Sequence, residues 1–185
     1  MKKIFFYFCI FLLFCGNVFS ESINENFKLN KLFDELKETK SASVAFEIEK
    51  KIWSIWSTHP VKNKLTESLN LGSELMSNGK LELAYEIFSE IVKSEPNWSE
   101  GWNKRATVLY LMGRYQDSLR DINVVLELES RHFGALSGQG LVYIKLNQYE
   151  KAIDSYKEAQ KIYPSIKSSK LMIPQLKELI KKETL

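Results

Sequence analysis

Small and large apolar residues recur along this chain at a fixed interval of 34 residues. A shift of that length aligns Gly72 with Ala106 and Gly140, so small side chains stand at all three places. Other small, large apolar and turn-forming residues align in the same way: Leu75, Leu109 and Tyr143; Gly79, Gly113 and Asn147; Ala84, Ser118 and Ala152; Phe88, Ile122 and Tyr156; Pro96, Ser130 and Pro164. A fixed period of this length is typical of repeat proteins. It predicts three consecutive units: 65–98, 99–132 and 133–166.

Each unit has the pattern of two antiparallel helices. Gly72 and Ala84 mark the place where the two helices approach closely, because larger side chains there would force them apart. Gly79 can adopt the left-handed conformation that ends the first helix. Pro96 ends the second helix, since proline cannot continue helical hydrogen bonding. Each unit is therefore predicted to be a helical hairpin.

Helical patterns continue on both sides of the three units. Residues 26–59 hold apolar side chains at helical spacing, and Pro60 follows them, which predicts an N-terminal helical hairpin that we interpret as a degenerate repeat. Residues 167–185 have an amphipathic pattern that predicts a capping helix over the last unit. Its polar side carries Lys167, Lys170, Lys177, Lys181 and Lys182. The terminal unit of a repeat array needs such a polar outer face to stay soluble.

The first residues, 1–20, have the pattern of a secretory signal peptide. Two lysines follow Met1, an unbroken apolar run extends from Ile4 to Cys15, and small residues precede Glu21. We expect cleavage after about Ser20 and an exported protein, periplasmic or secreted. The apolar run is shorter than the ~20 residues that span a bilayer, so we expect no stable membrane span in the mature chain. Retention of this segment as an anchor is the alternative.

Removal of residues 1–20 changes the charge and the cysteine content. The full sequence holds 26 basic and 23 acidic side chains, and its net charge of +3 falls close to zero once Lys2 and Lys3 are removed. Both cysteines also lie in the removed segment, which excludes disulfides and cysteine-ligated metals from the mature chain. A nearly neutral chain, whose lysines concentrate on a capping helix, is not expected to bind nucleic acid.

No constellation of residues in the sequence points to catalysis or to a cofactor. His59 and His132 are far apart and have no cysteine near them, which argues against a metal site. Ser137 lacks the glycine two positions earlier that a nucleophile elbow requires. Gly138 and Gly140 are spaced as in a nucleotide-binding loop, but Gly140 already has a packing role in the repeat. We therefore expect a noncatalytic protein without metal or cofactor.

The repeat pattern resembles the tetratricopeptide repeat family at several independent positions. Trp102 stands at the family's tryptophan position, and Leu71 with Gly72 at its Leu-Gly pair. Ala152 and Tyr156 match its later alanine and aromatic residue. The stretch that follows Trp102 is also similar to secreted repeat proteins of alphaproteobacteria. The resemblance implies an all-α fold, an α-solenoid in which antiparallel helix pairs form a right-handed superhelix with a concave groove.

The resemblance also implies where a partner binds, because in this family the first helix of each pair lines the concave face. The matching positions form a predicted peptide-binding groove: Leu69, Ser73, Met76, Asn103, Thr107, Tyr110, Ser137, Leu141 and Ile144. Such a mixed stripe suits an extended peptide or a short amphipathic helix. The clamp that some family members use for a terminal carboxylate is missing, because its places carry Leu69, Ser73, Gly134 and Gly138, and only Lys104 is basic.

Charged residues near the groove allow two interpretations. Arg105 departs from the family pattern, which has leucine at this inward-facing position. We expect Arg105 to form a buried ion pair with Asp121, and the alternative is that Arg105 holds a ligand carboxylate. Lys104, Arg131 and His132 are further candidates for polar contacts with a partner. For the turn that contains Arg131 and His132, the alternative is a cap for the neighbouring helices.

Together these patterns predict a noncatalytic exported protein that mediates protein–protein interaction. As an adaptor or assembly factor, it would bind a peptide or helix of a protein client in its concave groove. The alternative is a structural scaffold of the cell envelope that self-associates through the ends of its array. The oligomeric state separates the two, because growth with concentration favours the scaffold and a monomer favours the adaptor.

Overall fold

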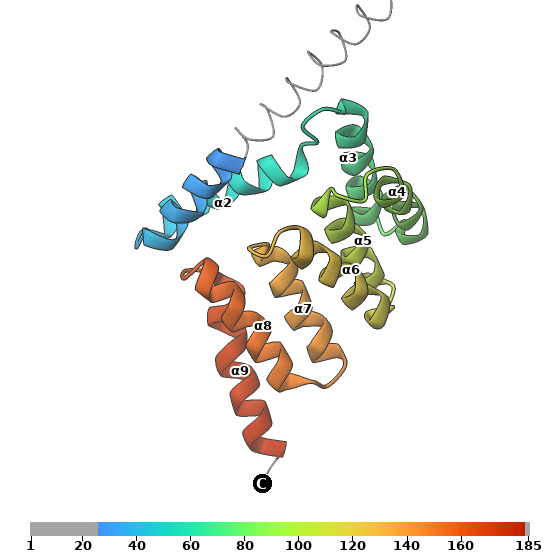
Figure 1. Cartoon of the computed structure of the whole chain (residues 1–185). Coiled ribbons are helices and arrows are strands. Elements are labelled where there is room, and N and C mark those ends of the chain that lie inside the picture. The colour runs from blue at the N-terminus through green and yellow to red at the C-terminus, as the bar shows by residue number, and fades with distance from the viewer. Residues whose placement is uncertain (1–25, 184–185) are drawn as a thin grey trace, which may run out of the picture.

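The computed structural model of this protein describes residues 26–183, which form helices joined by short turns (Figure 1). The predicted signal peptide and its cleavage site lie outside the described residues. The all-α fold expected from the sequence is confirmed, since no strand occurs anywhere in residues 26–183.

The helices follow the 34-residue period of the sequence. In chain order they are a helix covering residues 26–38, α2 (Ala42–Ser57), α3 (Asn63–Ser77), α4 (Leu81–Ser94), α5 (Ser99–Leu111), α6 (Tyr115–Leu128), α7 (Phe133–Lys145), α8 (Tyr149–Ile162) and α9 (Lys167–Glu183). The pairs α3–α4, α5–α6 and α7–α8 pack one after another, and α9 packs against α8 (Figure 1). This succession forms an α-solenoid.

The first helix of each pair ends at a residue in the left-handed conformation. The backbone angle φ is 73° at Gly79, 75° at Gly113 and 56° at Asn147. Glycine adopts this conformation without a steric penalty, and asparagine tolerates it better than most residues. Just after Gly79, the backbone N–H of Lys80 donates to the carbonyl of Leu75 at 2.9 Å, which closes the helix end. The expected helix termination is therefore confirmed.

Small residues allow the two helices of a pair to pack closely. A Cβ atom at Gly72 would lie 2.6 Å from Cε1 of Phe88, and one at Gly140 would lie 2.7 Å from the ring of Tyr156. Phe88 and Tyr156 are themselves almost completely buried. In the first and third units, the small residue and the large apolar residue that recur in the sequence thus form one and the same contact, as expected.

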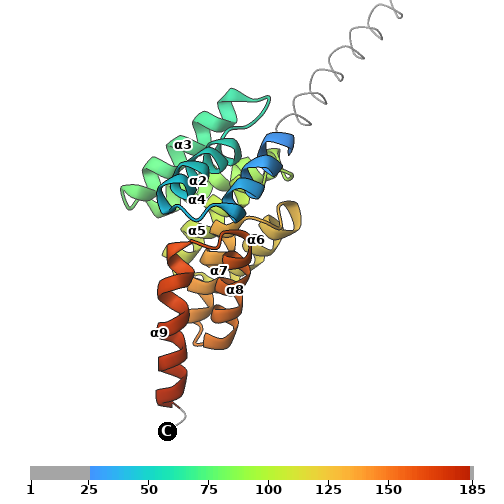
Figure 2. The same cartoon turned by 90° about the vertical axis from the view of Figure 1, so that its left-hand side faces the viewer.

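The N-terminal hairpin, made of residues 26–38 and α2, does not stack on α3. Its apolar side packs instead on the ends of α7 and α8 and on the turn before α9. One buried cluster unites the two parts: Leu29, Phe33, Leu36, Ala45, Ile48, Ile52 and Trp56 with Phe133, Leu136, Ala159, Tyr163 and Ile166. Figures 1 and 2 both show the hairpin across these helix ends. The aromatic side chains of the hairpin therefore pack against the third pair, and its interpretation as a degenerate repeat stays a prediction.

Long-range hydrogen bonds connect the hairpin to two places in the array. Nε1 of Trp98, at the start of α5, donates to the backbone carbonyl of Trp56 at 2.9 Å. The hydroxyl of Tyr163, after α8, donates to Oε2 of Glu49 at 3.1 Å. Burial and the carboxylate of Glu49 raise the pKa of Tyr163, so this hydroxyl keeps its proton. The hairpin therefore bridges the second and third helix pairs.

Candidate functional site

A pocket of about 230 Å³ lies between α5, α6 and α7. Five of the residues predicted to line the groove surround it: Asn103, Thr107, Tyr110, Ser137 and Leu141. The rest of the lining is mostly small or apolar, with Ala106, Ile122, Gly134, Ala135 and Gly138 among its members. Since α5 and α7 are the first helices of their pairs, the pocket lies where the repeat pattern places the groove.

Two glycines of α7 determine the space in this pocket. A Cβ atom at Gly138 would have Cδ1 of Ile122 as its nearest neighbour, at 3.9 Å, so the space in front of Gly138 is open. A Cβ atom at Gly134 would lie 2.5 Å from Cη2 of Trp53 in the hairpin. Gly134 is therefore in close contact with Trp53, and the space in this pocket is open at Gly138.

The polar side chains of the pocket are held by hydrogen bonds within the chain. Oγ1 of Thr107 donates to the carbonyl of Asn103 at 2.9 Å, and Nδ2 of Asn103 donates to Oε2 of Glu100 at 3.0 Å. Oγ of Ser137 lies 3.0 Å from Oγ of Ser168 in α9. No residue that lines the pocket carries a charge. The pocket therefore offers apolar contacts and hydrogen-bonding groups rather than a site for an ion.

Other predicted groove residues are placed differently. Leu69 is 1% exposed, because it belongs to a core that Val108 of α5 completes, so it offers no surface to a partner. Its assignment to the groove surface is corrected. Oγ of Ser73 donates to the carbonyl of Leu69 at 2.7 Å, and Met76 packs partly buried against the same core. Ile144 packs in the same way against the core between α8 and α9.

The helix α9 extends the groove face, which the residue-by-residue prediction left out. Ser168 of α9 contacts Ser137, and one turn later Leu171 is 62% exposed. Residues three or four positions apart share a helix face, so Leu171 follows Ser168 as Leu141 follows Ser137. One more step of 34 residues from Ser137 leads to Leu171. The period in the sequence thus contained the signal for this residue.

The ion pair expected between Arg105 and Asp121 is confirmed. Nε and Nη2 of Arg105 donate to Oδ2 and Oδ1 of Asp121 at 2.7 and 2.8 Å, a bidentate geometry. The two side chains are 19% and 6% exposed, and the guanidinium lies 4.7 Å from the ring centre of Trp102. The hydrogen bonds to Asp121 raise the pKa of Arg105. This geometry favours the structural role of Arg105 over the alternative that it holds a ligand carboxylate, because its Nε and Nη2 already donate to Asp121.

Lys104 and His132 converge on a buried carboxylate instead of facing a partner. Nζ of Lys104 lies 3.3 Å from Oε1 of Glu100, and Nε2 of His132 lies 3.2 Å from its Oε2. Nδ1 of His132 accepts the N–H of Ala135 at 3.0 Å, so the proton of the neutral ring is on Nε2 and points at Glu100. The ring of Trp56 stacks on His132 with centroids 4.0 Å apart. His132 is completely buried, and its assignment as a partner contact is corrected.

Arg131 is also committed to contacts within the chain. Its guanidinium forms an ion pair with Glu129 at 2.9 Å and donates to Oδ1 of Asn30 at 2.8 Å. It also lies 4.3 Å from the ring centre of Phe33 in the hairpin. The turn before α7 therefore has a structural role, which was the alternative interpretation of this turn. It also holds the N-terminal hairpin in place.

Metal binding and membrane crossing have no candidate in the described part of the chain. Among residues 26–183, no group of three or more His, Cys, Asp and Glu side chains is placed to hold a metal ion. Over the same residues, no helix combines the length and the apolar character that a membrane span needs.

Comparisons with known proteins point to one family. The family model for the tetratricopeptide repeat matches residues 134–166. A TPR repeat-containing protein of Rhizobium etli is 29% identical over 153 residues, which cover 82% of this chain and 74% of that protein. The human DnaJ homolog subfamily C member 3 is 28% identical over 116 residues, which cover 63% of this chain but 23% of that protein.

Solved structures show the same fold. The first TPR domain of Spaghetti (RPAP3), solved bound to the HSP90 peptide SRMEEVD, matches with a TM-score of 0.61 and 16% sequence identity. The match covers 64% of this chain and 94% of that domain. The helical-repeat solenoid expected from the 34-residue period is therefore confirmed.

Proposed function

We propose that this chain is a tetratricopeptide repeat protein that acts as a noncatalytic adaptor or assembly factor. Its partner is a protein or peptide client, bound in the concave groove along α5 and α7. The RPAP3 domain of the same fold was solved with a peptide bound, which supports a role in protein–protein interaction. The pocket between α5, α6 and α7 is the observation that carries the proposal.

The pocket takes one large apolar side chain of the client as an anchor. Burial of a leucine or phenylalanine side chain contributes about 1.5–3 kcal/mol, whereas a Kd of about 1 μM requires about 8 kcal/mol. The client must therefore also contact the rim. Tyr110, Leu141 and Leu171 supply partly or largely exposed apolar surface there. A segment of several residues, extended or helical, meets this requirement.

The client segment is apolar and uncharged rather than an acidic tail. The pocket lining contains no charged residue, and the nearby cations Lys104 and Arg105 already pair with Glu100 and Asp121. A peptide such as SRMEEVD would bring several carboxylates to a pocket whose lining carries no cation, which is unfavourable. The client therefore differs in chemistry from the peptide that the RPAP3 domain binds.

A pull-down from an envelope extract of the source organism, with the full chain as bait, tests the groove. Gly138→Leu fills the open space of the pocket, and Leu141→Glu places a charge on its rim. Both variants are expected to lose the client that the unaltered chain captures. Val44→Glu is the matched control, because Val44 is also an exposed apolar residue but lies on α2. It is expected to keep the client.

One result would contradict this function, and a second would contradict only the chemistry assigned to the client. Equal capture by all four baits, with equal helix content by circular dichroism, would exclude the groove as the binding surface. Titration with the peptide SRMEEVD tests the chemistry of the client, and we expect no saturable binding. Saturable binding that Gly138→Leu abolishes would keep the groove but refute the preference for uncharged segments.

Export is a separate part of the proposal, supported by the signal-peptide pattern of residues 1–20. Mass spectrometry of the protein from fractionated cells of its source tests it. We expect a chain that begins near Glu21 in the periplasmic or secreted fraction. A chain that keeps Met1 in the cytoplasmic fraction would refute export and leave the groove proposal standing.

A further inference from the structure

The first helix pair has an outer side that no described residue covers. Inside the array, such sides are closed by neighbouring pairs: a Cβ atom at Gly101 of α5 would lie 2.8 Å from Cγ2 of Ile91 in α4. The two helices that precede α3 do not cover the outer side of the first pair, because the N-terminal hairpin that they form packs on α7 and α8 instead. The end of the array at α3 and α4 is therefore open, and α9 lies at the other end (Figure 1).

This open end carries an apolar hollow. A space of about 360 Å³ lies between α3 and α4, and its apolar lining comes from Leu65, Ile87 and Ile91. On the same two helices, Leu71 and Leu83 are 51% and 50% exposed. An apolar hollow, with further exposed leucines on the same two helices, is typical of an interaction site.

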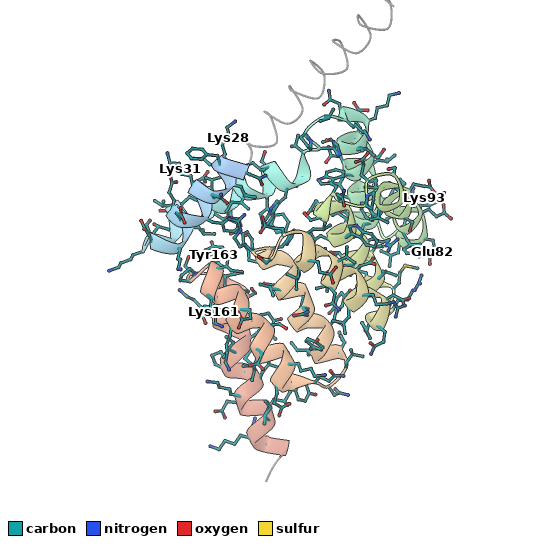
Figure 3. All side chains as sticks on the ribbon, in the orientation of Figure 1. Lys28, Lys31, Glu82, Lys93, Lys161 and Tyr163 are labelled. Atoms are coloured by element: carbon teal, nitrogen blue, oxygen red, sulfur yellow. The ribbon has the colours of Figure 1, made fainter. Side chains whose placement is uncertain are left out.

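Acidic side chains border the hollow. Glu82, Glu86 and Glu90 follow at intervals of four on α4, so they form one row, and the last two line the hollow. Glu90 contacts Lys93 at 4.0 Å, whereas Glu82 and Glu86 make no ion pair with any described residue. Figure 3 shows Glu82 and Lys93 at the outer margin of the molecule on α4. The partner for this surface should therefore be basic.

The helix α9 has the complementary chemistry. Lys170, Pro174 and Lys177 lie on one side of it at intervals of four and three, and all three are exposed. Pro174 continues the series of small residues that includes Gly140, so this side is where a following helix would pack if the array continued. The long stems of lysine side chains cover apolar surface while their ammonium groups stay at its edge. This side of α9 can therefore cover an apolar hollow with an acidic border.

We propose that α9 of a second copy of this chain docks on the hollow between α3 and α4. Lys170 and Lys177 meet the row that contains Glu86 and Glu90, and their stems cover Leu65 and Ile87 in the hollow. The two surfaces differ and lie at opposite ends of the array, so the contact is heterologous and builds an open head-to-tail assembly. The pocket between α5 and α7 takes no part, so client binding and self-association are independent properties. With both surfaces present, the oligomeric state alone does not separate an adaptor from a scaffold.

Sedimentation velocity of the full chain over a concentration series tests the proposal. In low salt, the weight-average mass should at least roughly double from dilute to concentrated samples, because a heterologous contact adds further copies. Raising the salt from about 0.05 M to about 0.5 M should reverse much of this growth, since salt screens exposed charges.

Charge reversal identifies the two surfaces. Glu86→Lys with Glu90→Lys makes the hollow basic, and Lys170→Glu with Lys177→Glu makes α9 acidic. Each double variant alone brings like charges together and should sediment as a single chain. An equimolar mixture of the two should associate again, because each variant then offers the other an opposite charge at both ends.

A double variant with the same change in charge serves as the control, and three results would refute the proposal. Glu127→Lys with Glu150→Lys changes the charge equally, on exposed residues of α6 and α8, and should leave association unchanged. A chain that stays monomeric at every concentration would overturn the proposal. So would a mixture that stays monomeric although both variants keep their helix content. Association that no reversal affects would assign self-association to another part of the chain and equally refute this contact.

Discussion

Removal of Asp121 alone should destabilise this protein, whereas joint replacement of Arg105 and Asp121 should not. In Asp121→Ala, the guanidinium of Arg105 stays between α5 and α6 but loses the carboxylate that accepts two of its hydrogen bonds. Loss of one partner from a buried ion pair costs about 3–5 kcal/mol. Arg105 is 19% exposed, so water compensates part of the loss, and we expect a decrease in the free energy of unfolding of about 3 kcal/mol.

The double variant Arg105→Leu with Asp121→Leu removes both charges together. It restores leucine at the inward-facing position of Arg105, where related repeats have it. Replacement of a buried ion pair by packed apolar residues is often neutral or stabilising by about 1–4 kcal/mol. We therefore expect a free energy of unfolding within about 1 kcal/mol of the unaltered chain, or above it.

Urea unfolding followed by circular dichroism measures both effects. Asp154→Ala is the control, because Asp154 pairs with Lys157 at 3.2 Å on the surface of α8, where both side chains are more than half exposed. Removal of such a pair should change the free energy of unfolding by less than about 1 kcal/mol. If Asp121→Ala unfolded at the same urea concentration as Asp154→Ala, the argument from burial would be refuted.

Three further predictions follow from the packing and from one titrating group. Gly140→Ala should cost about 1–3 kcal/mol in urea unfolding, because the new methyl group meets the ring of Tyr156 at 2.7 Å, whereas Gly138→Ala, with 3.9 Å of clearance, should not. Trp56→Ala should cost about 3–5 kcal/mol and split the urea transition in two as the hairpin detaches; an unchanged single transition would contradict this. Burial and a neighbouring lysine lower the pKa of His59 in the folded protein, so the unfolded chain binds the proton first and stability should fall as the pH drops below about 6.5. His59→Asn should flatten that part of the pH profile, and an unaltered profile would exclude His59 as its cause.

The repeat array could be predicted from the sequence because each recurring position acts locally. Gly72 and Phe88 contact each other within one hairpin, and Gly79 ends the helix in which it lies. Such short-range requirements leave a period that is visible without knowledge of the fold. The partner of Arg105 could be predicted for the same reason, since Asp121 lies on the facing helix of the same unit.

The position of the hairpin could not be predicted in this way. An apolar stripe with Trp53 and Trp56 shows that α2 is buried on one side, but not which surface buries it. Arg131 and His132 stand at a turn, where polar residues usually face solvent, and only the distant hairpin covers them. Leu69 was misassigned for a related reason: its position in the repeat faces the groove, but in this chain it completes a core with α5.

The bridging position of the hairpin has a consequence for how the chain matures. Asn30 and Arg131, which bond to each other, are 101 residues apart in the chain, and Glu49 and Tyr163 are 114 apart. Synthesis proceeds from the N-terminus, so the hairpin emerges long before its partners in α7 and α8 exist. Until then its aromatic residues have no surface to bury them, and they are open to capture by a chaperone. Folding of this protein is thus completed by the part of the described chain that is made first.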